Sequence, residues 1–361
     1  MSVGIRSVAY HVPATVRDNA YWHENYPDLV VAAEHKTLAK VWRKRDAEAP
    51  NTFDRCMAPY LDDPFRGSVQ RRVLGEGETG LGMELAAARA ALEAARWAPS
   101  ELDLVLVSSF LPDQFGPGNA AYLIRDLGAR CPGINLESAC SSTLVSLNTA
   151  VGLVQAGHYR NALVVASCSY SKIAPENDTM SWFMGDGAGA FLVGETAEDR
   201  GWVAQHTVDT SATCGTFRLD LVVDPELGAV PRIAASKDTA KIINESGEPV
   251  MREACFGALK KAGIGVEDLA CLVVNTPTAW YADFACEVLG VDRSRAVCSY
   301  ERFANTGTAL LPINMHGSAQ RGMLRDGDWV LLYAVGSVST AVATVIRWSR
   351  DIALGALPDA V

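Results

Sequence analysis

A cysteine inside a turn of small residues is the first candidate for chemistry in this chain. Cys140 lies in the segment ESACSST, between the predicted short strand GINLE and the predicted helix LVSLNTAVGLV. A cysteine at such a turn lies near unpaired backbone N–H groups and near the positive end of the helix dipole. Both features favour the thiolate, so the position predicts a lowered pKa for the Cys140 thiol. The same N–H groups would stabilise an oxyanion formed on a thioester, and we predict that Cys140 is a nucleophile.

The other cysteines and the glycine-rich segment indicate no metal, disulfide or nucleotide site. The chain has nine cysteines, an odd number, which are scattered and form no CxxC pair. Cys168 and Cys271 lie in strongly apolar segments, and we expect both to be small buried hydrophobic residues. The segment GDGAGAFLVG lacks GxGxxG spacing followed by a helix, because a strand follows it instead.

An internal repeat indicates how the chain positions Cys140. ELDLVLVSS around residue 103 and VEDLACLVVN around residue 268 have the same layout 165 positions apart, and each follows an Ala-rich helical stretch. Apolar strands without alternation, separated by helices, are typical of buried parallel strands with helices on both faces. The repeat therefore predicts a duplicated α/β fold in which Cys140 and Asn305 occupy equivalent positions, each entering a helix. Pseudo-twofold symmetry would bring these two helix starts together.

We predict two halves, residues 1–200 with the nucleophile and residues 201–361, and an insertion or cap over about residues 22–76. The insertion does not fit the repeat, is helical in part and has Pro-rich joints. Its segment HKTLAKVWRKR, residues 35–45, is a dense basic run. Two interpretations of this run stay open: a solvated helix face, or a docking surface for an acidic carrier.

Composition excludes several classes of protein. The chain has 361 residues, 49% of them hydrophobic, and a formal net charge of −10. An acidic balance argues against nucleic acid as a partner, because phosphate binding depends on clustered Lys and Arg. The first residues have no signal-peptide pattern, and no apolar stretch reaches the ~18 residues that span a bilayer. We expect a cytoplasmic protein that binds neither nucleic acid nor a membrane.

Several segments, taken in order, resemble the ketoacyl synthase III enzymes, which initiate fatty acid and polyketide chains. Together they cover nearly the whole chain apart from the insertion. In chain order they are GIRSVAYHVPATVRDN, RRVLGEGETGLGMELAAARAALEAA, ESACSSTLVSLNTA, MGDGAGAFLVG and DGDWVLLYAVGSVSTAVATVIRW. The resemblance implies the thiolase fold, with duplicated βαβαβαββ halves in a five-layer α-β-α-β-α architecture, usually as a homodimer. It also implies no tightly bound cofactor, with coenzyme A or the phosphopantetheine of an acyl carrier protein carrying the acyl substrate.

The resemblance also implies roles for single residues. Cys140 would accept the acyl group from acyl-CoA or an acyl carrier protein. Asn305, in FANTG, matches the family's Asn, which donates a hydrogen bond to the thioester carbonyl of the second substrate. The backbone N–H groups of Cys140 and of Ser337, in VGSVS, would form the oxyanion hole. At the end of the strand CLVVN the family has a histidine, where this chain has Asn275.

The amide of Asn275 changes the expected chemistry. It can donate a hydrogen bond, but it cannot give or take a proton at neutral pH, and a positioned acid or base contributes ~10²–10⁴-fold. Acylation of Cys140 does not need it, whereas decarboxylative carbon–carbon bond formation is less assured. We therefore favour an acyltransferase that passes the acyl group from Cys140 to a small-molecule O, N or S acceptor in specialised metabolism of the polyketide or antibiotic type. The alternatives are a decarboxylative condensing enzyme and a non-catalytic partner subunit of an active ketosynthase.

Overall fold

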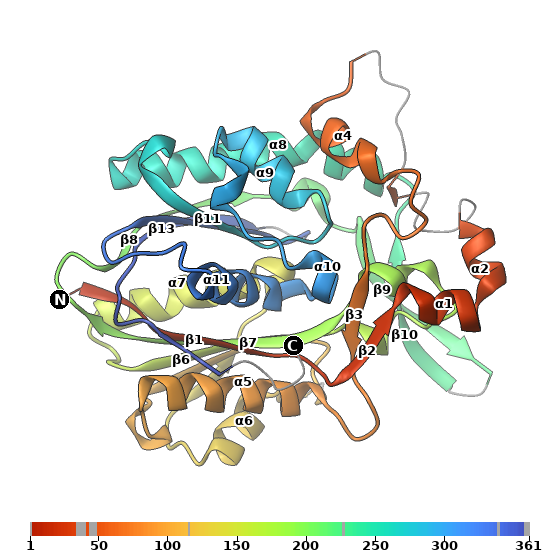
Figure 1. Ribbon diagram of the computed structural model, residues 1–361. Helices are drawn as coiled ribbons and strands as arrows, with labels where there is room; N and C mark the ends of the chain where they lie inside the picture. The colour runs from red at the N-terminus through yellow and green to blue at the C-terminus, as the bar shows by residue number, and fades with distance from the viewer. Residues whose placement is uncertain are drawn as a thin grey trace.

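The computed structural model describes residues 2–33, 41–42, 49–114, 116–225, 228–337 and 340–356. Five layers follow one another in Figure 1: the outer helices α8 and α9, a sheet, the central helices α7 and α11, a second sheet, and the outer helices α5 and α6. The layers alternate α-β-α-β-α, as the resemblance to the ketoacyl synthase III enzymes implies. This arrangement covers both faces of each sheet with helices, which is the usual setting of buried, mostly apolar strands.

The two sheets share the order of four strands. The larger sheet has the order β5-β4-β6-β7-β1-β14 and the smaller one has β11-β12-β13-β8, so β4, β6, β7 and β1 correspond to β11, β12, β13 and β8. In each sheet a parallel pair, β4 with β6 or β11 with β12, continues into antiparallel strands. The strands of the two sheets are β1 Ser2–His11, β4 Leu104–Phe110, β5 Gly133–Asn135, β6 Ala162–Ser169, β7 Asp186–Thr196, β8 Gly201–Asp209, β11 Leu269–Val274, β12 Trp329–Val335, β13 Thr340–Arg347 and β14 Ala353–Leu354.

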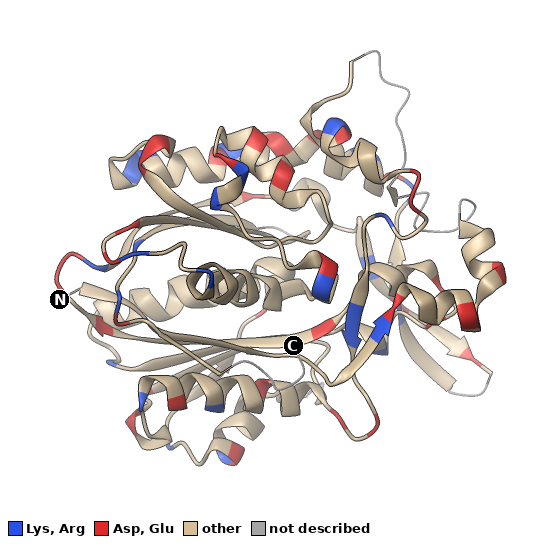
Figure 2. Cartoon of the chain, viewed as in Figure 1, with Lys and Arg blue, Asp and Glu red and all other residues tan. Residues whose placement is uncertain are grey.

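The central helices are α7 and α11, and neither contains a charged residue (Figure 2), since both are enclosed between the two sheets. The outer helix α5 packs on its sheet through buried alanines, whose small side chains allow a close approach of helix and strands. The helices of the layers are α5 Gly80–Ala95, α6 Ala120–Leu127, α7 Ser142–Gln155, α8 Thr239–Ala262, α9 Tyr281–Leu289 and α11 Leu310–Gln320, with the short α10 at Tyr300–Phe303.

A group of short elements lies beside the layers and is called the cap here. It contains the strand pair β2 (Thr15–Asp18) and β3 (Gln70–Val73) with the helices α1 (Asn19–Asn25), α2 (Pro27–Val31) and α4 (Thr52–Met57), so it begins before the predicted insertion of about residues 22–76. Next to it, β9 (Phe217–Asp224) and β10 (Gly228–Ala235) form a separate hairpin. The basic run 35–45 lies outside the described residues except for positions 41 and 42, so its two interpretations stay predictions.

Polar contacts fix the cap to the rest of the chain. The buried Arg71 donates hydrogen bonds to the backbone oxygen of Trp182, which precedes β7, and to Ser68. On the other side, Asn51 at the start of α4 donates to Asn244 of α8. The described part of the cap is therefore joined to both halves of the chain.

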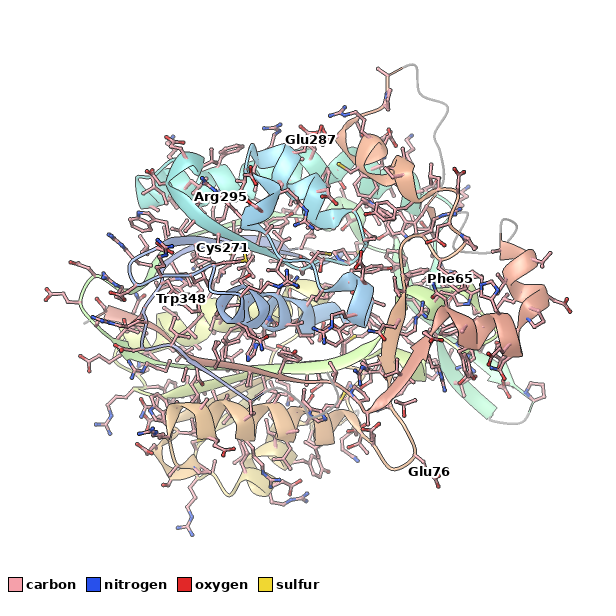
Figure 3. All side chains as sticks on the ribbon, in the orientation of Figure 1. Phe65, Glu76, Cys271, Glu287, Arg295 and Trp348 are labelled. Atoms are coloured by element: carbon pink, nitrogen blue, oxygen red, sulfur yellow. The ribbon has the colours of Figure 1, made fainter. Side chains whose placement is uncertain are left out.

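All nine cysteines belong to the described residues and are free. Cys168 and Cys271, the latter labelled in Figure 3, are fully buried on strands, as predicted. Within the described ranges, no group of His, Cys, Asp or Glu side chains is arranged to hold a metal ion. Over the same ranges, no helix combines the length and the apolar character that crossing a membrane requires.

Candidate active site

One cavity of about 370 Å³ brings together the four residues that the sequence singled out. Its lining includes Cys140, Asn275, Asn305 and Ser337. Asn275 directly follows β11, and Ser337 follows β12 after one residue, so the cavity opens at the carboxyl ends of this parallel pair. Sites in parallel α/β sheets commonly lie at such ends.

A strained turn presents Cys140 to the cavity. Ala139 has a φ of 47°, an unusual value for a residue with a side chain, and Cys140 follows it at the head of α7. The turn is held by serine hydroxyls: Ser142 Oγ accepts from the Ser138 N–H at 2.7 Å and donates to the Ala139 oxygen at 2.6 Å. Ser141 Oγ donates to the Ser138 oxygen at 2.7 Å. These bonds explain why a run of small hydroxyl residues surrounds the cysteine.

The backbone at Gly336 approaches this turn closely. A Cβ added at Gly336 would lie 2.5 Å from the Ser138 oxygen, so a side chain at this position would push the two segments apart. This contact sets the neighbouring Ser337 against the Cys140 turn. The sequence analysis predicts that the N–H of Ser337 contributes to an oxyanion hole, and a close approach of this kind is what that prediction requires.

Asn305 enters the cavity from the second half. Its side-chain oxygen accepts from the Gly307 N–H at 2.8 Å, which fixes the amide plane. Its backbone bonds to the segment before β7, from its N–H to the Phe183 oxygen at 3.0 Å and from the Gly185 N–H to its own oxygen at 2.9 Å. Asn305 is thus rigidly held, while its side-chain NH₂ group remains a donor for a ligand in the cavity.

The two helix starts meet as the repeat predicts. Thr143 in α7 and Thr308 before α11, 165 positions apart, hydrogen-bond to each other: the Thr143 N–H donates to Thr308 Oγ1 at 3.0 Å, and the two hydroxyl oxygens lie 2.6 Å apart. The pair is buried between the sheets. It joins the segments that carry Cys140 and Asn305.

The side-chain amide of Asn275 is hydrogen-bonded to the backbone of Val335. Its Nδ2 donates to the Val335 oxygen and its Oδ1 accepts from the Val335 N–H, each at 3.3 Å. The side chain is buried and links the end of β11 to the end of β12. Asn275 therefore supports the backbone that leads to Gly336 and Ser337, a contact that the sequence did not indicate.

The expected lowering of the Cys140 pKa is wrong. Burial raises the pKa of the Cys140 thiol, a hydrogen bond from Tyr170 opposes this rise, and the nearby charge of Glu137 adds to it. Desolvation disfavours the thiolate more than the turn favours it. The sequence did not indicate this, because the depth of the cysteine and the direction of Glu137 depend on tertiary packing.

Tyr170 is the site residue that the sequence analysis missed. Its hydroxyl lies 3.7 Å from the Cys140 Sγ, and its buried ring lines the cavity and packs against Phe110 with ring centroids 5.4 Å apart. It directly follows β6, whose counterpart in the repeat is β12, the strand that leads to Gly336 and Ser337. That equivalence in the repeat is the signal that could have drawn attention to it.

No histidine among the described residues lines the cavity. His316 points elsewhere, because its Nε2 lies 2.9 Å from the Gly355 oxygen and its ring packs edge-on against Tyr10. His35 lies outside the described residues. The remaining walls are mostly apolar and come from the cap, the β9–β10 hairpin and α8: Trp42, Phe53, Phe217, Leu219, Ile233, Ile243 and Val250.

Comparison with known proteins identifies the class. The five layers and the cysteine between two helix starts define a thiolase-like fold, and the chain superposes on 3-oxoacyl-ACP synthase III of Thermus thermophilus. The TM-score is 0.78 at 25% identity, covering 96% of this chain and 99% of that structure. A priming beta-ketosynthase from a polyketide biosynthetic pathway has the same fold, with a TM-score of 0.78 at 22% identity, covering 96% of each chain.

Sequence comparison gives the family. Residues 134–212 match 3-oxoacyl-[acyl-carrier-protein] synthase III, and residues 259–348 match the C-terminal part of the same family. The beta-ketoacyl-[acyl-carrier-protein] synthase III of Desulfitobacterium hafniense is 32% identical over 298 residues, which is 79% of this chain and 88% of that protein. The chain belongs to the beta-ketoacyl-ACP synthase III family and is an acyltransferase of that type. The resemblance stated from the sequence is confirmed.

Proposed function

We propose that this enzyme loads an acyl group from acyl-CoA or an acyl carrier protein onto Cys140 and passes it to an O, N or S nucleophile in specialised metabolism. The observation that carries the proposal is the cavity itself, which combines a cysteine with two asparagine amides and has no histidine among its described lining residues. Synthase III enzymes act on acyl thioesters of both carriers, which supports the choice of donor.

The loading step requires only groups that this cavity offers. The Cys140 sulfur loses its proton to solvent and attacks the thioester carbonyl, and a new carbon–sulfur bond forms. The N–H groups of Cys140 and Ser337 stabilise the oxyanion of the tetrahedral intermediate. The bond to the carrier sulfur then breaks, and the carrier thiolate takes up a proton. No imidazole is needed at any point.

The transfer step depends on the acceptor. A hydroxyl, amine or thiol attacks the acyl carbonyl, the bond to Cys140 breaks, and the acceptor proton returns the sulfur to its thiol form. The NH₂ group of Asn305 donates to the carbonyl during this attack. Such acceptors are nucleophilic themselves. The absence of an acid or base therefore slows acyl transfer to them less than it slows a decarboxylative condensation.

Decarboxylative condensation is the second candidate, and the comparisons favour it over the first. The curated relative and the Thermus thermophilus structure described above are named as synthase III enzymes, and the other solved structure is named as a priming ketosynthase. In this reading the carbonyl of a malonyl thioester would receive hydrogen bonds from asparagine amides. Asn275, whose amide is occupied by Val335, would first have to give up that partner.

A paired assay separates the two candidates. The acylated enzyme is mixed with a malonyl thioester in one sample and with a panel of alcohols, amines and thiols in the other. Acyl transfer to a panel member without release of carbon dioxide supports the proposal. Release of carbon dioxide with a β-keto product supports condensation and overturns it. Asn275→His is run beside the unaltered enzyme, and carbon dioxide release only in that variant attributes the difference in chemistry to residue 275.

We also propose a cytoplasmic homodimer. The edge strand β5 supports the dimer, because all three of its residues are exposed and Ile134 among them is an apolar side chain 45% exposed. An exposed edge strand can pair with the same strand of a second copy. Light scattering after size exclusion tests this: Ile134→Lys should convert a dimer to a monomer, and a monomeric unaltered chain would contradict the proposal.

A further inference from the structure

Tyr170 and Cys140 form a direct contact that the acyl-transfer steps above do not use. The phenol oxygen lies 3.7 Å from the Cys140 Sγ, within the range of a hydrogen bond to sulfur. Both residues line the same cavity, and the tyrosine is only 5% exposed. A buried hydroxyl usually has a polar partner, and this one has a potential nucleophile.

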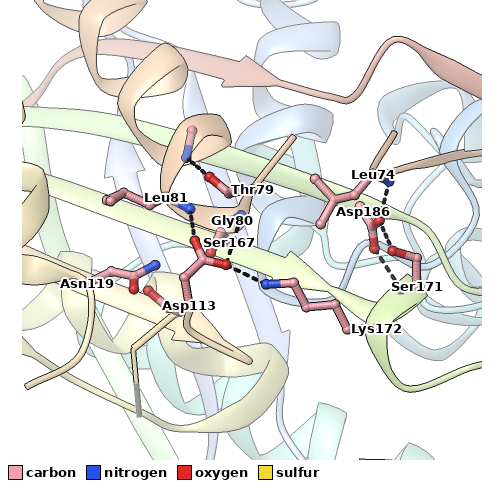
Figure 4. Close-up of polar contacts among 12 residues, drawn as sticks. Leu74, Thr79, Gly80, Leu81, Asp113, Asn119, Ser167, Ser171, Lys172 and Asp186 are labelled. Carbon is pink, nitrogen blue, oxygen red and sulfur yellow. Dashed lines mark hydrogen bonds and ion pairs between the residues drawn. The ribbon is translucent and has the colours of Figure 1, made fainter. Parts of the chain in front are cut away.

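The turn that carries Tyr170 is fixed from two directions. The carboxylate of Asp186 accepts from the N–H of Ser171 at 2.9 Å and from its hydroxyl, and it also accepts from the Leu74 N–H at 2.7 Å. Lys172 forms an ion pair with Asp113 (Figure 4). The residues that follow Tyr170 are therefore anchored, and the position of its ring is set by the fold.

Asp113 extends this support to the helix α5. Its carboxylate accepts from the Leu81 N–H at 2.6 Å and from the Gly80 N–H at 3.4 Å, which satisfies free N–H groups in the first turn of the helix (Figure 4). Asp186 is fully buried at the start of β7. Two carboxylates from different elements thus position one short turn, and that turn places a hydroxyl beside the reacting sulfur.

Other titratable groups near Cys140 do not supply this contact. Glu137, in the same turn, accepts from the Ala139 N–H at 2.6 Å and adds negative charge near the sulfur. Cys168, on β6, lies near both Cys140 and Tyr170, and a charge on its sulfur would oppose a charge on either of them. Tyr281 of α9 also lines the cavity, but no hydrogen bond joins its hydroxyl to the Cys140 sulfur.

One cation among the described residues lines the cavity, and it is paired with a carboxylate of its own strand. Arg218 is paired with Asp220, with a nitrogen–oxygen distance of 2.9 Å, on the β9 strand. Of the side chains near the Cys140 sulfur, Tyr170 favours the thiolate and Glu137 opposes it.

We propose that Tyr170 is a catalytic residue that donates a hydrogen bond to the Cys140 sulfur, both when the sulfur attacks an acyl thioester and when it leaves. This role rests on the acyl transfer proposed above. The phenol keeps its proton throughout, so the balance of bonds in each step is unchanged. Hydrogen bonds to a charged partner are stronger than those to a neutral one, so the contact stabilises the thiolate more than the thiol.

The test measures the sulfur without any acyl substrate. The full chain is alkylated with iodoacetamide between pH 6 and pH 11, and peptide mass spectrometry follows the modification of Cys140, with the exposed Cys214 as a reference for the reagent. Tyr170→Phe should move the midpoint for Cys140 upward by about one pH unit and slow its alkylation about tenfold below that midpoint. A profile equal to that of the unaltered chain would overturn the proposal.

Two further variants complete the experiment. Tyr281→Phe removes a hydroxyl from the same cavity and should leave the midpoint where it is; a shift equal to that of Tyr170→Phe would contradict a specific role. If Tyr170→Phe does not fold, Cys168→Ala takes its place, because it removes the neighbouring thiol and keeps the phenol. Alkylation at least as fast as in the unaltered chain then supports the role, and a tenfold loss contradicts it.

The acylation assay separates this inference from the proposed function. If the unaltered chain accepts no acyl group but Tyr170→Phe still shifts the alkylation profile, the proposed function fails and the contact of Tyr170 with the sulfur stands. If the unaltered chain is acylated and the profile does not shift, only the inference fails. When both hold, Tyr170→Phe should slow acyl loading at pH 7 by about the same factor of ten as alkylation.

Discussion

Ala139 and Ala304 are separated by the same 165 positions as the bonded pair Thr143 and Thr308, and both have positive φ, 47° and 53°. Each alanine immediately precedes a residue that lines the cavity, Cys140 or Asn305. The repeat thus reproduces a strained backbone position as well as the order of strands. Strain that persists at equivalent points in two halves indicates that the fold needs this geometry to present the following side chains.

Substitution at Ala304 tests this strain. Its φ of 53° with ψ of −153° belongs to a region that glycine occupies most readily. Ala304→Val should lower the free energy of unfolding by about 3 kcal/mol or more, because a branched side chain is added at a buried position with positive φ. Ala304→Gly should change it by less than about 1 kcal/mol. Urea unfolding measures both, with Ala94→Val in α5 as a helical control.

The close approach at Gly336 gives a second prediction. Gly336→Ala places a Cβ 2.5 Å from the Ser138 oxygen, so the Ser337 N–H should move away from the Cys140 turn. Loss of one oxyanion donor costs ~10²–10³-fold, and a displaced donor should lower the rate of acyl loading by at least about tenfold. Gly152→Ala in α7, where an added Cβ meets no atom within 4 Å, is the control and should load normally. Normal loading by both variants would contradict the predicted oxyanion hole.

Asn305 should matter for transfer more than for loading. Asn305→Ala removes the amide that we propose donates to the acyl carbonyl during transfer, but it leaves Cys140 and its backbone N–H groups in place. Single-turnover mass spectrometry should show loading within about threefold of the unaltered rate and transfer slowed by about 10²-fold. If loading falls as far as transfer does, Asn305 acts on the acyl donor as well, and the division of roles is wrong.

The raised pKa of Cys140 predicts a pH dependence. Its rate of alkylation should level off at higher pH in the folded chain than in the urea-unfolded chain, where the thiol has its ordinary value of about 8.5. Between these two values the unfolded state has released a proton that the folded state retains, so the contribution of Cys140 to stability falls as pH rises. A folded-state midpoint below the unfolded one would restore the original expectation of a lowered pKa.

The strand pattern and the repeat predicted a duplicated α/β fold and the meeting of the two halves, because both can be read from the residues alone, and the five layers followed from the family resemblance. It could not predict that Asn275 bonds the backbone of Val335, or that burial would outweigh the helix terminus at Cys140, since both depend on atoms brought from distant segments. Tyr170 was missed for a similar reason. In the segment SCSYSK it is one more aromatic residue after a buried strand, and only its distance from the sulfur marks it.

Acylation of Cys140 is the claim on which the rest depends, and intact-protein mass spectrometry tests it most directly. The purified chain and Cys140→Ala are each incubated with acetyl-CoA, octanoyl-CoA and benzoyl-CoA. We predict one acyl adduct with at least one donor on the unaltered chain, mapped to the Cys140 peptide and absent from the variant. An equal adduct on Cys140→Ala, or no adduct with these donors and their carrier-protein counterparts, would contradict the account.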